Sequence, residues 1–296
     1  TNNGEHMLFD AARGATHGLH VDYLVGGGWT NANTLSAFNS DGFSLGADHT
    51  LGSKEGSKYV GWCWDAGTAA ATASTEGSIT PDAQWVNSTV GLSISKFENV
   101  ANSQTIGHGL SVEPDLIITK NIDNALAFQI YHKSAGSGAK LYFSNSAAVS
   151  SSMWGSGPDN DVFTYDDGNT GTCIAYCWAA IPNFSAFGSY EGNDGNGTGP
   201  FVYTGFRPRY VMIKSMDQTQ DWIIHDSVRG GDNVVHNYLK ANSNGSENTT
   251  ENNNCIDILS NGFIPRAVNT ANAAVNEDTL VYLAFAEHPF KIARAR

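Results

Sequence analysis

An apolar pattern near the end of this sequence occurs three times, and an internal repeat constrains the fold more than any single motif. The three copies are residues 280–289 (LVYLAFAEHP), 173–182 (CIAYCWAAIP) and 59–67 (YVGWCWDAG). Large apolar side chains alternate with smaller ones in each copy when Phe285 is aligned with Trp178 and Trp64. This period of two is typical of a β-strand with one buried face, so Val281, Leu283 and Phe285 are predicted to be buried in the third sandwich.

Further segments repeat at nearly constant spacing around these copies. Residues 7–14 (MLFDAARG) match 223–230 (IIHDSVRG), and residues 40–43 (SDGF) match 260–263 (SNGF). Residues 114–120 (PDLIITK) match 208–214 (PRYVMIK), and residues 128–136 are a more divergent match to 222–230. One full unit is therefore roughly a hundred residues long, and the first unit lacks its opening half.

The repeat predicts a partial first unit, a linker or loose edge segment, and two full units. Their bounds are 1–67, 68–89, 90–183 and 184–296. Because the first unit begins in the middle of the repeat, we expect this chain to be the C-terminal part of something longer. Short apolar runs between Gly, Asn and Asp turns, with weak helical periodicity, favour an all-β fold of tandem antiparallel β-sandwich repeats, jelly-roll-like, with the first repeat incomplete.

The composition excludes several classes of function. The 29 acidic residues outnumber the 16 basic ones and give a net charge of -13, which argues against nucleic acid as a partner. No run approaches 18 consecutive apolar residues, so membrane insertion is not expected. Charged residues make up 15% of the chain, below the typical share of about 25%, so the surface is expected to consist largely of Asn, Ser, Thr and Gly.

The cysteines and histidines show no metal-binding or nucleophile spacing. Cys63 and Cys177 occupy one position of the repeat, where the third copy has Ala284, so each is predicted to be a small side chain packed beneath a strand. A solvated surface position is expected for most of the histidines without a motif. These are His108, His132, His225, His236 and His288.

Two Asp–Arg pairs recur at the same spacing in the first and third units. Asp10 and Arg13 match Asp226 and Arg229, and a glycine follows each arginine. Because an active site rarely occurs twice in one chain, we interpret both pairs as structural ion pairs that fix the loop after a strand. No catalytic residue is predicted, and the chain is not expected to be an enzyme.

An oxygen-rich loop in the third unit is the candidate metal site. Glu191, Asn193 and Asp194 are residue types that bind calcium, although the loop lacks the spacing of an EF-hand. The same residues fall where a hairpin turn is needed, which is the favoured interpretation. A structural calcium ion is the alternative, and no other cofactor is expected.

Three tryptophans are the candidate binding residues. Trp29, Trp85 and Trp154 lie in stretches rich in Gly, Ser and Asn, apart from the alternating strands. Exposed rings of this kind stack on sugars or anchor partner proteins. The favoured interpretation is nevertheless that each ring folds back over its own sandwich.

The combined motifs resemble an uncharacterised repeat domain of tailed-phage virion proteins, common in marine phages including those of cyanobacteria. The residues that carry the resemblance are 9–15 (FDAARGA), 38–46 (FNSDGFSLG), 59–67, 199–208 (GPFVYTGFRP) and 284–291 (AFAEHPFK). The resemblance covers nearly the whole chain and carries no established catalytic residues. It implies a tail-fibre or similar structural protein, with trimers expected by analogy with such fibres.

Three functions follow as hypotheses. The first is a tail fibre or adhesin that is assembled in the host cytoplasm, exposed on the virion, bound to other virion proteins, and able to contact a host-surface glycan or protein. The second is a capsid-decorating or scaffold-like virion protein without a receptor. The third is a glycan-binding or polysaccharide-degrading appendage protein.

Overall fold

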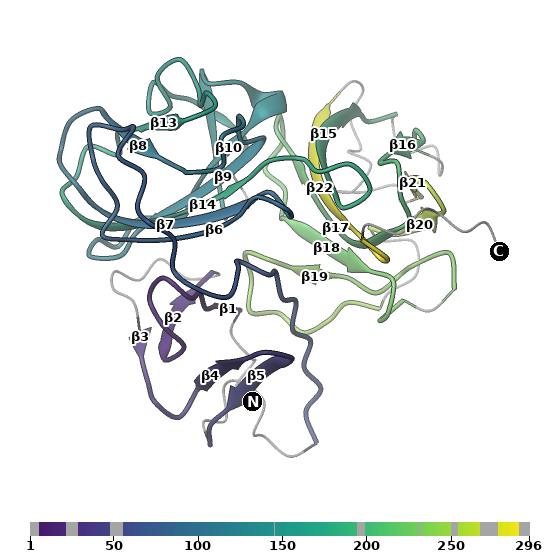
Figure 1. The fold of residues 1–296 in the computed structure, drawn as a ribbon. Coiled ribbons are helices and arrows are strands. Elements are labelled where there is room, and N and C mark those ends of the chain that lie inside the picture. The colour runs from purple at the N-terminus through teal and green to yellow at the C-terminus, as the bar shows by residue number, and fades with distance from the viewer. Residues whose placement is uncertain are drawn as a thin grey trace.

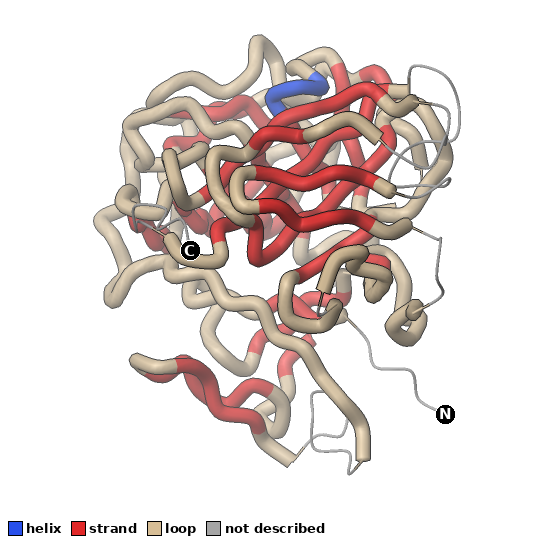
Figure 2. The backbone as a smooth tube through the Cα atoms, turned by 90° about the vertical axis from the view of Figure 1, so that its right-hand side faces the viewer, coloured by secondary structure: helices blue, strands red, loops and turns tan. Residues whose placement is uncertain are grey.

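The chain folds into antiparallel β-sheets, as the repeat pattern predicts. The computed structural model describes residues 6–21, 29–47, 56–144, 146–193, 199–230, 232–249, 254–266 and 278–289. Within these residues the helical structure is limited to one 3-10 turn, η2 (Lys133–Ala135). Figure 1 shows the strands gathered into two sandwiches, with the N-terminal unit beside them, and Figure 2 shows that the described chain is almost entirely strand and loop.

The second unit pairs one large sheet with one small sheet. The large sheet has seven strands in the order β12-β11-β10-β9-β14-β7-β6, and the small sheet pairs β13 with β8. The strands are β6 (Ala83–Asn87), β7 (Leu92–Asn99), β8 (Gln104–Gly107), β9 (Leu116–Asn121), β10 (Gln129–His132), β11 (Ala139–Tyr142), β12 (Val149–Ser150), β13 (Val162–Tyr165) and β14 (Gly171–Trp178).

The third unit repeats this plan. Its large sheet has the order β15-β22-β17-β18-β19, and its small sheet has the order β16-β21-β20. The strands are β15 (Ser185–Glu191), β16 (Val202–Tyr203), β17 (Pro208–Ser215), β18 (Ile223–Asp226), β19 (Leu239–Lys240), β20 (Ile256–Leu259), β21 (Gly262–Pro265) and β22 (Thr279–Ala286).

The strand registers confirm the internal repeat. Tyr176 of β14 pairs with Ile94 on one side and Ile118 on the other. At the equivalent position of β22, Leu283 pairs with Phe187 and Met212. Each full unit therefore has an opening half of three strands, β7–β9 or β15–β17, joined through residues 122–128 or 216–222 to a closing half.

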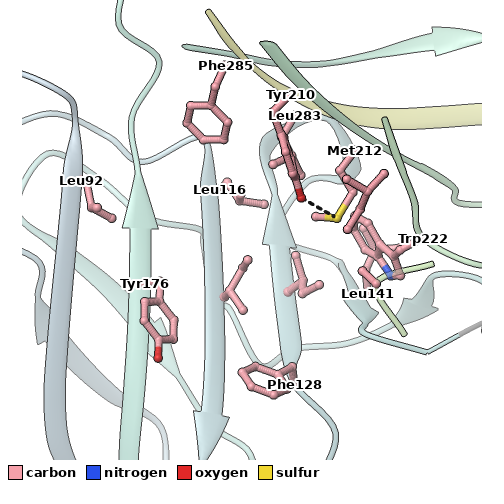
Figure 3. Close-up of a cluster of buried hydrophobic side chains, with 14 of the residues drawn as sticks. Leu92, Leu116, Phe128, Leu141, Tyr176, Tyr210, Met212, Trp222, Leu283 and Phe285 are labelled. Carbon is pink, nitrogen blue, oxygen red and sulfur yellow. Dashed lines mark hydrogen bonds between the residues drawn. The ribbon is translucent and has the colours of Figure 1, made fainter. Parts of the chain in front are cut away.

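The two large sheets pack against each other and share one apolar core. This shared core contains buried residues of β7, β9, β10 and β14 from the second unit and of β17, β18 and β22 from the third. Figure 3 shows part of it, with Leu116 and Tyr176 on one side and Leu283 on the other. Two further cores lie inside the sandwiches, between each large sheet and its own small sheet. The units therefore form one body with three apolar layers.

The closing strand β22 is buried on both of its faces. Val281, Leu283 and Phe285 are at most 6% exposed, which confirms the predicted burial. They face the shared core, however, while Leu280 and Tyr282 face the inside of the third sandwich. The expectation of one buried face is wrong because the second large sheet covers the face that would otherwise meet water.

The first unit forms small sheets that other parts of the chain cover less completely. It contains β1 (Met7–Leu8), β2 (His17–His20) and β3 (Trp29–Thr30) in one sheet, and β4 (Leu35–Asn39) with β5 (Gly42–Leu45) in a hairpin. Residues 59–66, the first copy of the repeated pattern, are not a strand, which corrects the prediction. The copies β14 and β22 each lie between two neighbouring strands, whereas no described strand pairs with residues 59–66.

The same extended segment closes one end of the shared core. The ring centroids of Trp62 and Trp64 lie 5.3 and 5.6 Å from that of Tyr210, both edge-on. Trp64 also meets Phe285 at 5.3 Å. The alternating tryptophans thus supply core packing even where no β-ladder forms.

The predicted linker at 68–89 is partly built into the second unit. Its residues 83–87 form β6 at the edge of the large sheet, next to β7. Ile79 forms a parallel bridge with Ile106, and its amide donates to the carbonyl oxygen of Thr105 at 3.0 Å. The segment therefore covers the edges of both sheets of the second unit.

Candidate functional site

None of the three candidate binding tryptophans is exposed. Trp154 is 1% exposed and lies inside the second sandwich, where its ring is 5.8 Å from that of Tyr131. Trp85 lies in strand β6 and packs on the shared core. Trp29 lies in β3, half-buried, with its ring 6.0 Å from that of His20. The interpretation that the ring folds back over its own sandwich is confirmed for Trp154, whereas Trp85 packs on the core that the second unit shares with the third.

An exposed aromatic pair lies instead at strand β16, with Phe201 just before the strand and Tyr203 within it. Phe201 and Tyr203 are 48% and 65% exposed, and their ring centroids are 6.5 Å apart. Val202 between them is buried in the third sandwich, so the two rings share the outward face of the strand. The second unit has Thr105 and Gly107 at the equivalent positions. The fold therefore does not require aromatic residues here, and comparison of the two repeats could have identified the pair.

The proposed calcium ligands are explained in part by the repeat. The carboxylate of Glu191 accepts a hydrogen bond from the Thr279 hydroxyl at 3.3 Å. Glu98, at the same position of the second unit, accepts one from Thr172 at 2.7 Å. Glu191 and Glu98 thus each bind a threonine within the first two residues of the closing strand of their unit. Asn193 ends the described part of this loop, and Asp194 lies outside the described residues.

No cluster of three or more metal-binding side chains occurs among the residues that the structure describes. Over the same residues, no helix is long and apolar enough to span a membrane.

Both predicted Asp–Arg ion pairs are present. Nε of Arg13 lies 2.6 Å from the Asp10 carboxylate, and Nε of Arg229 lies 2.5 Å from that of Asp226. Each carboxylate also accepts the backbone amide of its arginine, so it closes the turn after the strand.

The two pairs also join the units to one another. Asp10 of the first unit accepts a hydrogen bond from the buried Tyr176 hydroxyl of the second at 2.7 Å. Burial, followed by the nearby Asp10 carboxylate, raises the pKa of Tyr176 well above its usual range. Arg229 of the third unit lies over the Trp62 ring of the first, 5.5 Å from its centroid. The pairs therefore fix loops at the joints between units.

A cavity of about 360 Å³ lies where the first unit meets the second. Its lining includes Arg13, His17, Lys96 and Asp123. The Asp123 carboxylate accepts a hydrogen bond from the Thr172 amide at 2.7 Å. In the third unit, the Asp217 carboxylate accepts the equivalent bond from the Thr279 amide. The cavity can hold a small polar group, but two of its charged residues, Arg13 and Asp123, form hydrogen bonds within the loops that they support.

Three of the histidines expected at the surface are buried. His108, His132 and His225 are at most 1% exposed. Burial lowers the pKa of His132 to about 4, and burial with the adjacent Arg229 lowers that of His225 to about 3. Buried histidines of this kind are neutral at pH 7 and serve as packing groups, and His108 and His132 also form hydrogen bonds. His236 is half-buried, and His288 is exposed.

Two lysines are also buried, at one position of the repeat. Lys120 donates to the carbonyl oxygens of Asn121 and Asn124. Lys214 donates to those of Ser215 and Gln218, and burial lowers its pKa to about 8. Each ammonium group thus binds the turn that follows its own strand. In the sequence, the burial of these lysines is indicated only by their shared position in the repeat, since a lone lysine is usually at the surface.

The cysteines differ in exposure between the units. Cys177 is buried, as predicted, whereas Cys63 at the same repeat position is exposed. The prediction of a thiol beneath a strand fails for Cys63 because residues 59–66 have no second layer against that face.

Comparison with known proteins identifies one family. No curated protein and no solved structure matches the chain. One family model, described as "Domain of unknown function (DUF7483)", matches residues 1–289. The chain therefore belongs to the DUF7483 family, whose function is unknown.

Proposed function

We propose that this chain is a non-enzymatic structural protein of a tailed-phage virion, most specifically a tail fibre or adhesin that contacts the host surface. The observation that carries the proposal is the packing of two sandwiches through one shared core. Domains joined by a small polar interface move relative to each other, whereas a continuous apolar core resists bending. A rigid repeat array of this kind suits an appendage that must keep its shape outside the cell.

The motif resemblance and the composition support the same proposal. An acidic chain with few charged side chains matches the Asn- and Gly-rich surfaces of β-rich virion proteins. All four cysteines are free thiols, which fits assembly in a reducing host cytoplasm before exposure on the particle. Its partners are then other virion proteins, with a homotrimer as the expected assembly by analogy with fibres.

The exposed pair Phe201 and Tyr203 supports a contact with a glycan or protein on the host. Aromatic rings with one free face stack on sugar rings and anchor protein interfaces. Since the second unit does without them, the rings are available for binding and are not needed for folding.

The test is binding of the fluorescently labelled chain to cells of strains that are infected by a phage carrying it. Cell labelling that falls at least about tenfold in the double variant Phe201→Ser, Tyr203→Ser supports attachment through this pair. Val149→Ser is the matched control, because Val149 is an exposed apolar residue of the second unit. Absence of labelling on every infected strain, with antibody to the chain bound to phage heads, would replace the adhesin by the capsid-decorating function.

A separate assay addresses glycan cleavage. Incubation of the chain with purified host polysaccharide should release no fragments detectable by mass spectrometry. Fragment release that follows the chain through purification would contradict the non-enzymatic assignment.

A further inference from the structure

The hairpin β4–β5 of the first unit leaves an apolar face open. Phe38 and Phe43 pair across the hairpin and are 46% and 39% exposed. Tyr59 is 47% exposed, and Cys63 on the same extended segment is exposed as well. Large apolar side chains that lie close together in the open mark an interaction surface more often than scattered ones do.

The third unit shows what covers this face when a unit is complete. Its hairpin β20–β21 has the same register next to the turn, and Ile258 pairs with Phe263 where the first unit pairs Phe38 with Phe43. Ile258 and Phe263 are 1% and 0% exposed. Leu280 and Ala284, the counterparts of Tyr59 and Cys63, are fully buried. The open face of the first unit is therefore the inner face of a sandwich.

The residues that cover the third unit's hairpin come largely from its opening half. They are Tyr190, Val202, Phe206, Val211 and Ile213. Val202 pairs directly with Phe263, and the ring centroid of Tyr190 lies 5.9 Å from that of Phe263. Arg207 adds a hydrogen bond from Nη1 to the Ile258 carbonyl oxygen at 2.7 Å. An opening half thus supplies both the apolar layer and a strand partner for the hairpin.

We propose that the open face formed by Phe38, Phe43, Tyr59 and Cys63 binds an opening half of this same repeat, a β-sheet segment with the pattern of residues 185–215. The two complete units in this chain are the direct precedent, because both close the same inner face with three strands of that pattern. A folded second copy of the chain cannot supply this segment without breaking one of its own sandwiches. The occupant is therefore an additional opening half.

The test is a pair of chimeras in which residues 90–128 or 184–222 of this chain are placed directly before Met7. This junction reproduces the connection that leads into β10 or β18. The readout is the alkylation rate of Cys63, the exposed thiol, while Cys173, Cys177 and Cys255 are buried. We expect the Cys63 rate to fall at least about tenfold in at least one chimera, together with increased hydrogen-exchange protection of residues 35–45.

The matched control is the 184–222 chimera with Val202, Phe206, Val211 and Ile213 of the added copy changed to serine. It should leave the Cys63 rate and the exchange of residues 35–45 at the values of the original chain. Protection equal to that of the unaltered chimera would show nonspecific cover and overturn the proposal, as would failure of both chimeras to protect Cys63.

Sedimentation of the original chain tests the other occupant. We expect the Phe43→Asp variant to sediment like the original chain over the concentration range measured. Self-association that disappears in Phe43→Asp would assign the face to a second copy and would also overturn the proposal.

Discussion

Acidification should destabilise this protein through His132 before most carboxylates titrate. Nε2 of His132 lies 3.1 Å from the Tyr282 carbonyl oxygen, which can only accept, so Nε2 carries the proton. Nδ1 accepts a hydrogen bond from the Ser134 amide at 3.2 Å. A proton on Nδ1 would therefore point at the N–H group of Ser134. The folded protein therefore requires the neutral ring, and the bond to Tyr282 joins the second unit to the third.

The direction and size of the effect follow from the pKa. Burial lowers the pKa of His132 from 6.5 to about 4 in the folded state. The unfolded chain then takes up the proton first, so stability that is present above pH 6.5 is lost as pH falls from 6.5 through 4. Proton linkage gives a loss of about 2 kcal/mol at pH 5 and about 3 kcal/mol at pH 4 from this group.

The assay is urea unfolding of wild type and His132→Gln at pH 7.5, 6.5, 5.5 and 5.0. The variant should be less stable than wild type at pH 7.5. The gap between their free energies of unfolding should narrow by about 2 kcal/mol at pH 5, because glutamine does not titrate. Val228→Thr, at an exposed position, is the control and should keep a constant gap. A His132→Gln gap that stays constant to within about 0.5 kcal/mol would refute the buried neutral histidine.

Three further predictions concern stability measured by urea unfolding at pH 7.5. Arg229→Met should lower the free energy of unfolding by about 3–5 kcal/mol because it leaves a buried carboxylate unpaired. Lys240→Met, in a more exposed ion pair, should lower it by less than about 1 kcal/mol. Equal losses in the two variants would contradict the assigned burial. Phe263→Ala should cost about 3–5 kcal/mol and Phe43→Ala in the same chain less than about half of that, since only Phe263 is enclosed, and the reverse order would contradict the open face. Lys214→Met should cost about 1–3 kcal/mol through the loss of its two carbonyl contacts, and a neutral effect would show that the ammonium group is dispensable.

The topology could be predicted from the sequence because the repeat carries it. Matching residues 114–120 with 208–214 anticipates that β9 and β17 hold the same place in their sheets, and the registers agree. The predicted contact of Asp226 with Arg229 also follows from spacing, since the two side chains lie on one turn. Local patterns of this kind depend on residues close in the chain.

What the sequence could not predict depends on how the sheets pack on one another. The alternation in β22 indicates a covered face but not that a second sheet covers the other one as well. Trp154 lies in a stretch rich in Gly and Ser, yet it fills the interior of the second sandwich together with Tyr165, ten or so residues away along the chain. The exposure of Phe201 and Tyr203 could not be predicted from either residue alone, because large aromatic residues at a strand usually indicate the core.

The central place of β22 bears on how the chain folds as it is made. A ribosome releases the chain from its N-terminus at about 5–20 residues per second, so Thr279–Ala286 emerges long after β7, β9 and β14. Until then β15 and β17 lack the strand between them, and the outer face of the second unit's large sheet meets water in place of Leu283 and Phe285. Synthesis therefore passes through a period of several seconds in which a wide apolar sheet is exposed, during which a chaperone or a neighbouring chain can bind it.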